Sequence, residues 1–148
     1  MTLFPVEQQQ FTSDDYYTPP WVFETMGITF DLDVCSPPGG VPWIPAKRFY
    51  TMADDGLTAE WEGRVWMNPP FSKPSPWVNR FIAHRHGVAL LPFAKSAWFS
   101  LVWKQADALA YPGIDLSKFI GGPVFMPCVL AAFGDECIEA IRKLGRVR

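Results

Sequence analysis

The sequence predicts an α/β fold: an open, mostly parallel sheet with a late antiparallel strand, in one compact domain. Short β-prone runs alternate with segments whose apolar residues recur at helical spacing, which is the order of strands joined by helices. One run, Val88–Leu91, is apolar throughout, as in a strand buried on both faces of a sheet. The length of 148 residues fits one domain with its own core. We expect residues 14–148 to form this domain and residues 1–13 to form a polar N-terminal arm.

The composition is that of a folded protein without a strong electrostatic field. Apolar residues make up 49% of the chain and charged residues 19%, which excludes an intrinsically disordered chain. The formal net charge of -2 means that any binding to nucleic acid depends on local basic patches. Aromatic residues make up 16%, a share that serves either core packing or a surface on which bases or ligands stack.

Cysteine, histidine and hydropathy patterns indicate a cytoplasmic protein without disulfides or a metal. Cys35, Cys128 and Cys137 are odd in number and unevenly spaced, so we interpret them as reduced thiols. His84 and His86 have no cysteine nearby, so we expect a helix end at the surface rather than a zinc site. The first residues lack a signal peptide, and no run approaches the roughly 18 apolar residues of a membrane span.

Capping and turn signals order the first half of the chain. Thr18 followed by Pro19 is typical of a helix start, and Gly27 is typical of the residue that follows a helix. The elements expected here are, in order, a helix over residues 19–26, a strand over 28–35, a proline-rich loop over 36–47, a short extended piece over 48–51, a turn over 54–57, one helical turn over 58–61 and a strand over 64–67.

The second half repeats these signals. Ser75-Pro76 starts a helix that we expect Gly87 to end, and Ser96 is placed to cap the next one. On the first of these helices the apolar residues that share a face are Trp77, Val78, Phe81 and Ile82. The remaining expected elements are a strand over 88–91, a helix over 97–105, a strand over 107–111, an antiparallel pair over 123–126 and 128–133, and a helix over 135–144 with acids first and bases last.

Asn68-Pro69-Pro70-Phe71 follows the apolar strand and is suited to display groups at its end. The two prolines donate no backbone hydrogen bonds, and Pro70 holds Pro69 in an extended conformation. We therefore expect the carbonyls of this turn to be unpaired and fixed in direction. With the Asn68 side-chain oxygen and the flat face of Phe71, they suit a planar group that carries an NH2, such as the edge of adenine. A proline-stiffened structural turn is the alternative.

Polar residues follow three of the expected strands. Asp33 lies near the end of the first strand, Asn68 follows the central one, and Lys95-Ser96 follows the apolar one. Ligands of open α/β sheets bind at the carboxyl ends of strands, so we expect these groups to converge on one crevice. Asp55, which precedes the central strand, is expected to join them.

Two acceptors around the adenine amine would raise its reactivity. The lone pair of that amine is delocalised into the ring, and bonds from its two N–H groups to Asn68 Oδ1 and the Pro69 carbonyl would draw the nitrogen toward a tetrahedral geometry. The base must leave its stack to reach them, at roughly a few kcal/mol. Precise placement then supplies much of the rate, and the sequence contains no evident catalytic triad.

The ordered set of motifs resembles the phage-type DNA N6-adenine methyltransferases (the phage Dam family), which use S-adenosylmethionine. The resemblance covers roughly residues 14–134. It rests on Tyr16-Tyr17-Thr18-Pro19, Phe30-Asp31-Leu32-Asp33-Val34, Asp55-Gly56-Leu57, Trp61, Trp66-Met67-Asn68-Pro69-Pro70-Phe71, Leu90-Leu91-Pro92 and Trp98-Phe99. It implies a methyltransferase-like (Rossmann-like) sheet, methylation of adenine in double-stranded DNA with the target base flipped out, and a setting in the bacterial host of a phage or prophage.

The resemblance also implies roles for single residues. Asn68, Pro69, Pro70 and Phe71 would hold and activate the target adenine. Those that would contact the cofactor are Tyr17, Thr18 and Pro19 by its methionine portion, Asp33 by its methionine portion or ribose, and Asp55 at its adenosine end. Those that would line the base pocket or contact DNA are Lys95, Ser96, Trp98 and Phe99.

The chain departs from such enzymes in two respects. A Gly-x-Gly sequence after the first strand is missing, and the first glycines there are Gly39-Gly40. The length leaves little room for a separate target-recognition domain, so specificity must come from loops, the arm or a second subunit.

Other interpretations stay open at this stage. Thr18 also fits a helix cap, Asp33 an exposed carboxylate at a strand end, and Asp55 an ordinary turn residue. Any single lysine or arginine fits a solvated surface charge. For the whole chain, the same chemistry on a glutamine side chain or RNA is one alternative, and a non-catalytic methyltransferase-like module that binds nucleic acid or a partner is another.

Overall fold

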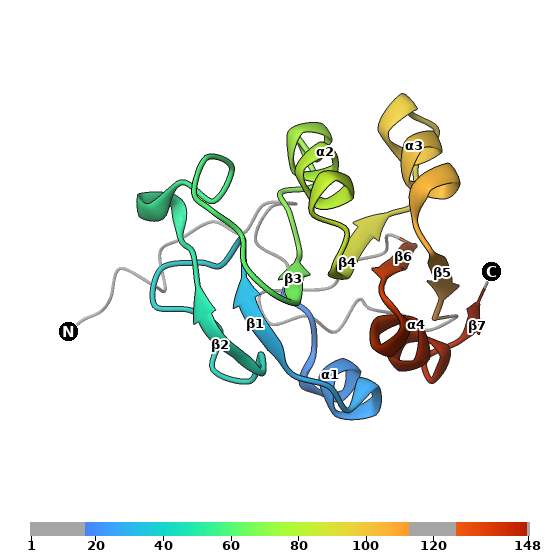
Figure 1. Cartoon of the computed structure of the whole chain (residues 1–148), viewed down its shortest axis with the longest axis horizontal. Helices are drawn as coiled ribbons and strands as arrows, with labels where there is room; N and C mark the ends of the chain where they lie inside the picture. The colour runs from blue at the N-terminus through green and yellow to red at the C-terminus, as the bar shows by residue number, and fades with distance from the viewer. Residues whose placement is uncertain (1–16, 113–126, 148) are drawn as a thin grey trace.

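The computed structural model describes residues 17–112 and 127–147. In this part of the chain, four α-helices and a 3-10 helix accompany one seven-stranded sheet (Figure 1). The elements are α1 (Pro20–Met26), β1 (Phe30–Asp33), β2 (Ala46–Phe49), η2 (Met52–Asp54), β3 (Val65–Met67), α2 (Ser75–His84), β4 (Gly87–Pro92), α3 (Ala97–Gln105), β5 (Ala108–Tyr111), β6 (Cys128–Phe133), α4 (Asp135–Arg142) and β7 (Arg146–Val147). The predicted arm over 1–13 and strand over 123–126 lie outside the described residues.

The sheet confirms the predicted class. Its strand order is β2-β1-β3-β4-β6-β5-β7. The first four strands in this order are parallel, and β6 runs antiparallel between β4 and β5. The final strand β7, which the sequence did not predict, pairs antiparallel with β5. From β1 the chain moves outward to β2 and then returns to β3 on the other side of β1, so the direction of strand addition reverses between β1 and β3.

Apolar layers cover both faces of the sheet. On one face α1 and α4 pack around Trp66, whose ring lies 4.7 Å from that of Phe23 between centroids. On the other face α2 and α3 pack around Phe81, whose ring lies 5.4 Å from that of Phe133. All six residues of β4 are buried, which confirms the prediction that this strand is covered on both sides. The four apolar residues predicted to share a face of α2 all join the second layer.

α1 begins one residue later than predicted, and Thr18 does not cap it. Because a residue before proline is held extended, Pro19 cannot enter the helix ahead of Pro20, and its backbone is in fact extended. Thr18 is buried and makes no cap bond to the helix. The helix ends as predicted, with Gly27 in the left-handed conformation at its C-cap.

α2 is present, but its predicted end at Gly87 is wrong. Its last residue is His84, and Arg85 takes the left-handed C-cap position with φ 59°. Gly87 is instead the first residue of β4. A Cβ atom there would lie 2.2 Å from the Val65 carbonyl oxygen, so this glycine allows β4 to approach β3 closely.

Two further predictions differ from the structure, while α3 spans the predicted residues. β2 starts at Ala46, inside the expected loop, because an edge strand with three exposed residues carries little apolar signal. The helical turn lies at η2 rather than over residues 58–61. It forms there because Thr51 and Asp54 make a capping box, in which the Thr51 backbone N–H donates to the Asp54 carboxylate at 2.8 Å.

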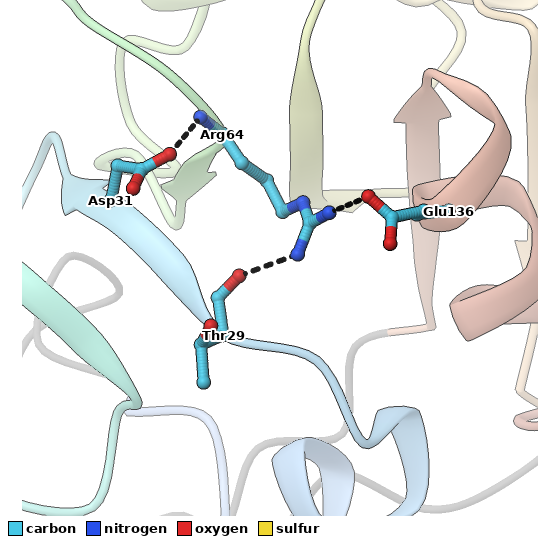
Figure 2. Close-up of polar contacts among 4 residues, drawn as sticks. All are labelled: Thr29, Asp31, Arg64 and Glu136. Carbon is cyan, nitrogen blue, oxygen red and sulfur yellow. Dashed lines mark hydrogen bonds and ion pairs between the residues drawn. The ribbon is translucent and has the colours of Figure 1, made fainter.

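Arg64 fixes the amino end of β3 (Figure 2). Asn68 follows the other end of this strand. The Arg64 backbone N–H donates to the Asp31 carboxylate at 2.8 Å, and its guanidinium donates to the Thr29 carbonyl at 2.9 Å and pairs with Glu136 of α4. The backbone hydrogen bond from Arg64 is the main cause that lowers the pKa of Asp31. The backbone and side chain of this one residue thus tie β1, β3 and α4 together.

Candidate functional site

The carboxyl ends of β1, β3 and β4 bring the predicted site residues to one edge of the sheet. These strands are neighbours and parallel, with Asp33 in register with Trp66 and Met67 in register with Ala89. Asp33 ends β1, and Asn68 directly follows β3. The edge between them is also where the strand order reverses, which is where open α/β sheets bind their ligands.

The Asn68–Phe71 turn is anchored on the sheet and on one apolar layer. Asn68 is partly buried and Pro69 is buried, directly beyond the buried strand β3. Phe71 is partly buried and packs against the layer that contains Trp66. The expectation that the carbonyls of this turn are unpaired is wrong for Pro70, which accepts a hydrogen bond from the Lys73 backbone N–H at 3.2 Å. The turn is therefore closed by a backbone bond and not only by its prolines.

Asp33 is buried rather than exposed, with 2% of its surface accessible. Burial raises the pKa of its carboxyl to about 7, against the opposing effect of a hydrogen bond from the Cys35 backbone N–H at 3.2 Å. The Asp33 carbonyl accepts from the Tyr50 backbone N–H at 2.8 Å, which fixes the strand end beside β2. A buried carboxyl near its midpoint at neutral pH is typical of a functional position.

A cavity opens beside Asp33, between β1, β2 and the loop that connects them. Its lining residues are Asp33, Gly39, Gly40, Val41, Pro42, Ile44, Ala46 and Phe49. Its volume of about 180 Å³ is below the few hundred Å³ of pockets that hold a whole small molecule, so it has room for only one part of such a ligand. Gly40 has φ 77°, and a Cβ atom on it would lie 2.8 Å from the ring of Phe49.

Gly39, Gly40 and Phe49 line this cavity but were not predicted from the sequence to belong to the site. Gly39-Gly40 was visible as a glycine pair after the first strand, but its distance from Asp33 along the chain hid its position. Phe49 is in register with Asp33 on the neighbouring strand and is 44% exposed. The feature that could have indicated Phe49 is an aromatic residue at the end of an extended segment, which in the structure adjoins Asp33.

The segment Tyr17-Thr18-Pro19 lies against the same connecting loop. The indole N–H of Trp43 donates to the Thr18 carbonyl at 2.7 Å. Tyr17 is partly buried and Pro19 is buried. Within the described part of the chain, the Thr18 hydroxyl is buried without a hydrogen-bond partner. An unsatisfied buried hydroxyl is costly, which makes this group a candidate to bond to a ligand.

Asp55 adjoins the segment just beyond β1 through its neighbour Gly56. It is exposed, with φ 54°, and its carbonyl accepts from the backbone N–H groups of Thr58 and Ala59. Its neighbour Gly56 lies so close that a Cβ atom there would be 2.3 Å from the Val34 carbonyl oxygen. Asp55 is not among the residues that line the cavity beside Asp33.

The residues beyond β4 divide into exposed and buried groups. Lys95 is exposed, and Trp98 is partly buried. Ser96 occupies the N-cap of α3 without a side-chain cap bond, and within the described residues its buried hydroxyl has no partner. Phe99 is only 7% exposed and belongs to the apolar layer below α3. All four follow β4 at the same edge as Asn68.

Neither a candidate metal site nor a membrane-spanning helix is found among the described residues. Over residues 17–112 and 127–147, no three His, Cys, Asp or Glu side chains gather in a way that would hold a metal ion. None of the helices in that part of the chain combines the length and the apolar character needed to cross a bilayer.

Comparison with known proteins identifies the family. The family described as DNA N-6-adenine-methyltransferase (Dam) matches residues 6–122. A DNA N-6-adenine-methyltransferase of Haemophilus phage HP1 (strain HP1c1) is 36% identical over 109 residues, an alignment that covers 66% of this chain and 61% of the phage protein. No solved structure matches the chain. The match over residues 6–122 spans the candidate site from Tyr17 to Phe99, and the chain belongs to the Dam family of DNA N-6-adenine methyltransferases.

Proposed function

We propose that this protein transfers a methyl group from S-adenosylmethionine to the N6 amine of an adenine in DNA, with the target base outside the helix. The observation that carries the proposal is the position of the Asn68–Phe71 turn, at the carboxyl end of β3 and beside the buried Asp33. Family membership and the phage relative support the reaction and its substrate class.

The residues around the cavity fit one end of S-adenosylmethionine, which supplies an electrophilic methyl group on a sulfonium when bound. The Asp33 carboxylate would accept hydrogen bonds from the ammonium or ribose hydroxyls of this ligand. The buried Thr18 hydroxyl has no partner within the described residues and would gain one. Gly40 leaves the space beside Phe49 free of a side chain, and the half-exposed Phe49 ring offers an apolar face. We assign the cofactor to this side of the sheet edge.

The Asn68–Phe71 turn would hold the base. Asn68 Oδ1 and the Pro69 carbonyl accept the two N–H groups of the amine, which concentrates its lone pair toward the methyl donor. Phe71 stacks on the ring, and its packing on the layer around Trp66 keeps that face in place. Because these acceptors are fixed before the base arrives, little reorganisation is needed during the reaction.

DNA would approach the edge beyond β3 and β4. Lys73 and Lys95 are exposed there and are available to phosphates. An adenine in a duplex does not present its amine to a buried turn, so the base has to rotate out of the stack, at roughly a few kcal/mol. The chain aligns with 61% of the phage protein, and the remaining residues of that relative have no counterpart in the alignment.

Replacement of Asn68 tests the proposal directly. We expect Asn68→Ala to lower kcat by about 100-fold or more, because a preorganised acceptor is lost, while cofactor affinity stays within about twofold. The assay is methylation of plasmid DNA from methylation-free cells, read base by base for N6-methyladenine, with calorimetry for S-adenosylmethionine. Asn79→Ala, at an exposed position of α2, is the matched control and should retain full activity.

Methyl incorporation measured separately in DNA, RNA and protein fractions, together with the same calorimetry, distinguishes the other functions. If methyl groups enter RNA or glutamine side chains while DNA stays unmodified, the substrate is RNA or protein and not DNA. Saturating S-adenosylmethionine without heat and without thermal stabilisation would indicate a non-catalytic module. Undiminished turnover by Asn68→Ala would remove the role of this residue even if DNA is the substrate.

A further inference from the structure

A second aromatic group lies at the same edge of the sheet, on the side away from the cavity. We call it the aromatic surface. It consists of Phe93, Trp98, Phe99, Trp103 and Tyr111. The Phe99 ring is its buried centre, at 5.0 Å from Phe93, 5.7 Å from Trp98 and 6.4 Å from Trp103 between centroids. Tyr111 extends it, at 6.4 Å from Phe93.

Three of these rings are exposed to an extent that core packing does not require. Phe93 is 49% exposed, Tyr111 47% and Trp103 41%. Among the described residues the exposed large apolar side chains are these three, Phe49 and Met52, so most of them gather on this surface. A contiguous apolar patch of this kind marks an interaction site in a folded protein.

The rings are held on rigid backbone at the edge that carries the Asn68–Phe71 turn. The Phe93 N–H donates to the Pro127 carbonyl at 2.9 Å, directly beyond β4. Tyr111 ends β5, which runs in the same direction as β4 because both are antiparallel to β6. The aromatic surface therefore continues the carboxyl edge from β3 past β4 to β5.

The charges around the aromatic surface favour an anionic occupant. Residues 93–106 contain Lys95 and Lys104 and no acidic residue, in a chain whose net charge is -2. Both lysines are exposed. Exposed rings combined with cations are the means by which proteins bind unpaired nucleic acid, since each base stacks on a ring while lysines contact the phosphates.

We propose that the aromatic surface stacks unpaired bases of the DNA strand that carries the target adenine. The proposal rests on the proposed function for its choice of DNA. The bases next to the flipped adenine lose their stacking partner. Phe93, which directly follows β4, offers an aromatic ring in its place. Tyr111 lies further along the edge and takes a more distant base. The surface thereby favours locally opened or single-stranded DNA over closed duplex.

Binding of the full-length protein to one labelled oligonucleotide, as a single strand and as a perfect duplex, tests this. We expect Phe93→Leu and Tyr111→Leu each to weaken single-strand binding by about fivefold or more, because leucine keeps apolar bulk but has no ring face. Tyr111→Phe should retain the affinity of the unaltered protein. Met52→Ala, at a residue 92% exposed on η2, is the control and should change nothing. Thermal melts of each variant report whether it is folded.

Affinity for the single strand within about twofold of the unaltered protein in both leucine variants would overturn the proposal. Equal affinity of the unaltered protein for single strand and duplex would also overturn it. If the leucine variants lose self-association and keep their DNA affinity, the surface is instead a contact between copies of the chain. The proposed function fails separately, if plasmid DNA stays unmethylated while the leucine variants still lose single-strand affinity.

Discussion

At the scale of single residues, burial raises the pKa of Asp33 in a way that its place in the sequence does not predict. A carboxyl at a strand end is usually solvated, but the crossover loop and β2 enclose this one. Its charged form is therefore disfavoured until a ligand supplies donors or a positive charge. In the proposed enzyme, cofactor binding would have to offset the cost of ionising Asp33. The affinity for S-adenosylmethionine is therefore expected to rise as pH increases through about 7, where Asp33 loses its proton.

The raised pKa of Asp33 makes a prediction for stability. Folded Asp33 holds its proton up to about pH 7, whereas the unfolded chain loses it near pH 3.9, so stability falls as pH rises between these values. The full effect is at most about 4 kcal/mol. In urea unfolding at pH 5 and pH 8, Asp33→Asn should gain stability relative to the unaltered protein at the higher pH. A pH-independent difference between the two proteins would contradict the pKa.

At the scale of elements, the loop between β1 and β2 replaces a crossover helix and lines the cavity. Gly39 and Gly40 both have positive φ, but only Gly40 lies against the Phe49 ring. Trp43 of the same loop holds the segment that contains Thr18. The loop thus connects the groups assigned to the cofactor.

The two glycines form a matched pair for an experiment. Gly39→Ala and Gly40→Ala should each lose about 1 kcal/mol or more from the strained backbone. Only Gly40→Ala should also weaken S-adenosylmethionine binding in calorimetry, because its methyl group displaces Phe49. A double variant that adds Phe49→Ala to Gly40→Ala removes the clash. Because it also lacks the aromatic ring, it should not regain the affinity for S-adenosylmethionine. Equal affinities in the two glycine variants would exclude the contact from the site.

Elements with strong periodicity or explicit end signals were predictable, and those fixed by neighbours were not. α3 matches its predicted bounds, and α1 ends at Gly27 as expected. β2 was misplaced because pairing with β1, and not its own composition, makes it a strand. In the site, the turn at Asn68 was predictable from local chemistry. The cavity was not, because it forms only when residues far apart in sequence, Asp33 and Phe49, come into register.

At the scale of the whole molecule, the charge balance limits how DNA can be bound. The net charge is -2, and the cations we assign to DNA are Lys73 and Lys95 at the carboxyl edge and Lys104 beside Trp103 of the aromatic surface. Few phosphates are then neutralised, and base stacking has to supply much of the affinity. This division is what the proposed stacking of unpaired bases on the aromatic surface requires.

The salt dependence of DNA affinity measures this balance. With about three phosphates contacted, the slope of log K against log salt concentration should be about -3. Fluorescence anisotropy from 50 to 300 mM salt gives the slope. A Lys95→Gln variant should make it shallower by about one, without a change in preference for single strands. A slope of -6 or steeper would indicate a larger basic surface than the one described.

The insertion of β6 between β4 and β5 has a consequence for the order of synthesis. Both neighbours leave the ribosome before β6 does, so neither can complete its pairing until residues 128–133 have emerged. The match to the Dam family ends at residue 122, before this strand. Nascent chains that lack β6 and α4 should therefore be open to protease and unable to methylate, which stalled translation products of increasing length would reveal. Methylation by the proposed enzyme would begin only after β6 and α4, residues 128–142, have emerged.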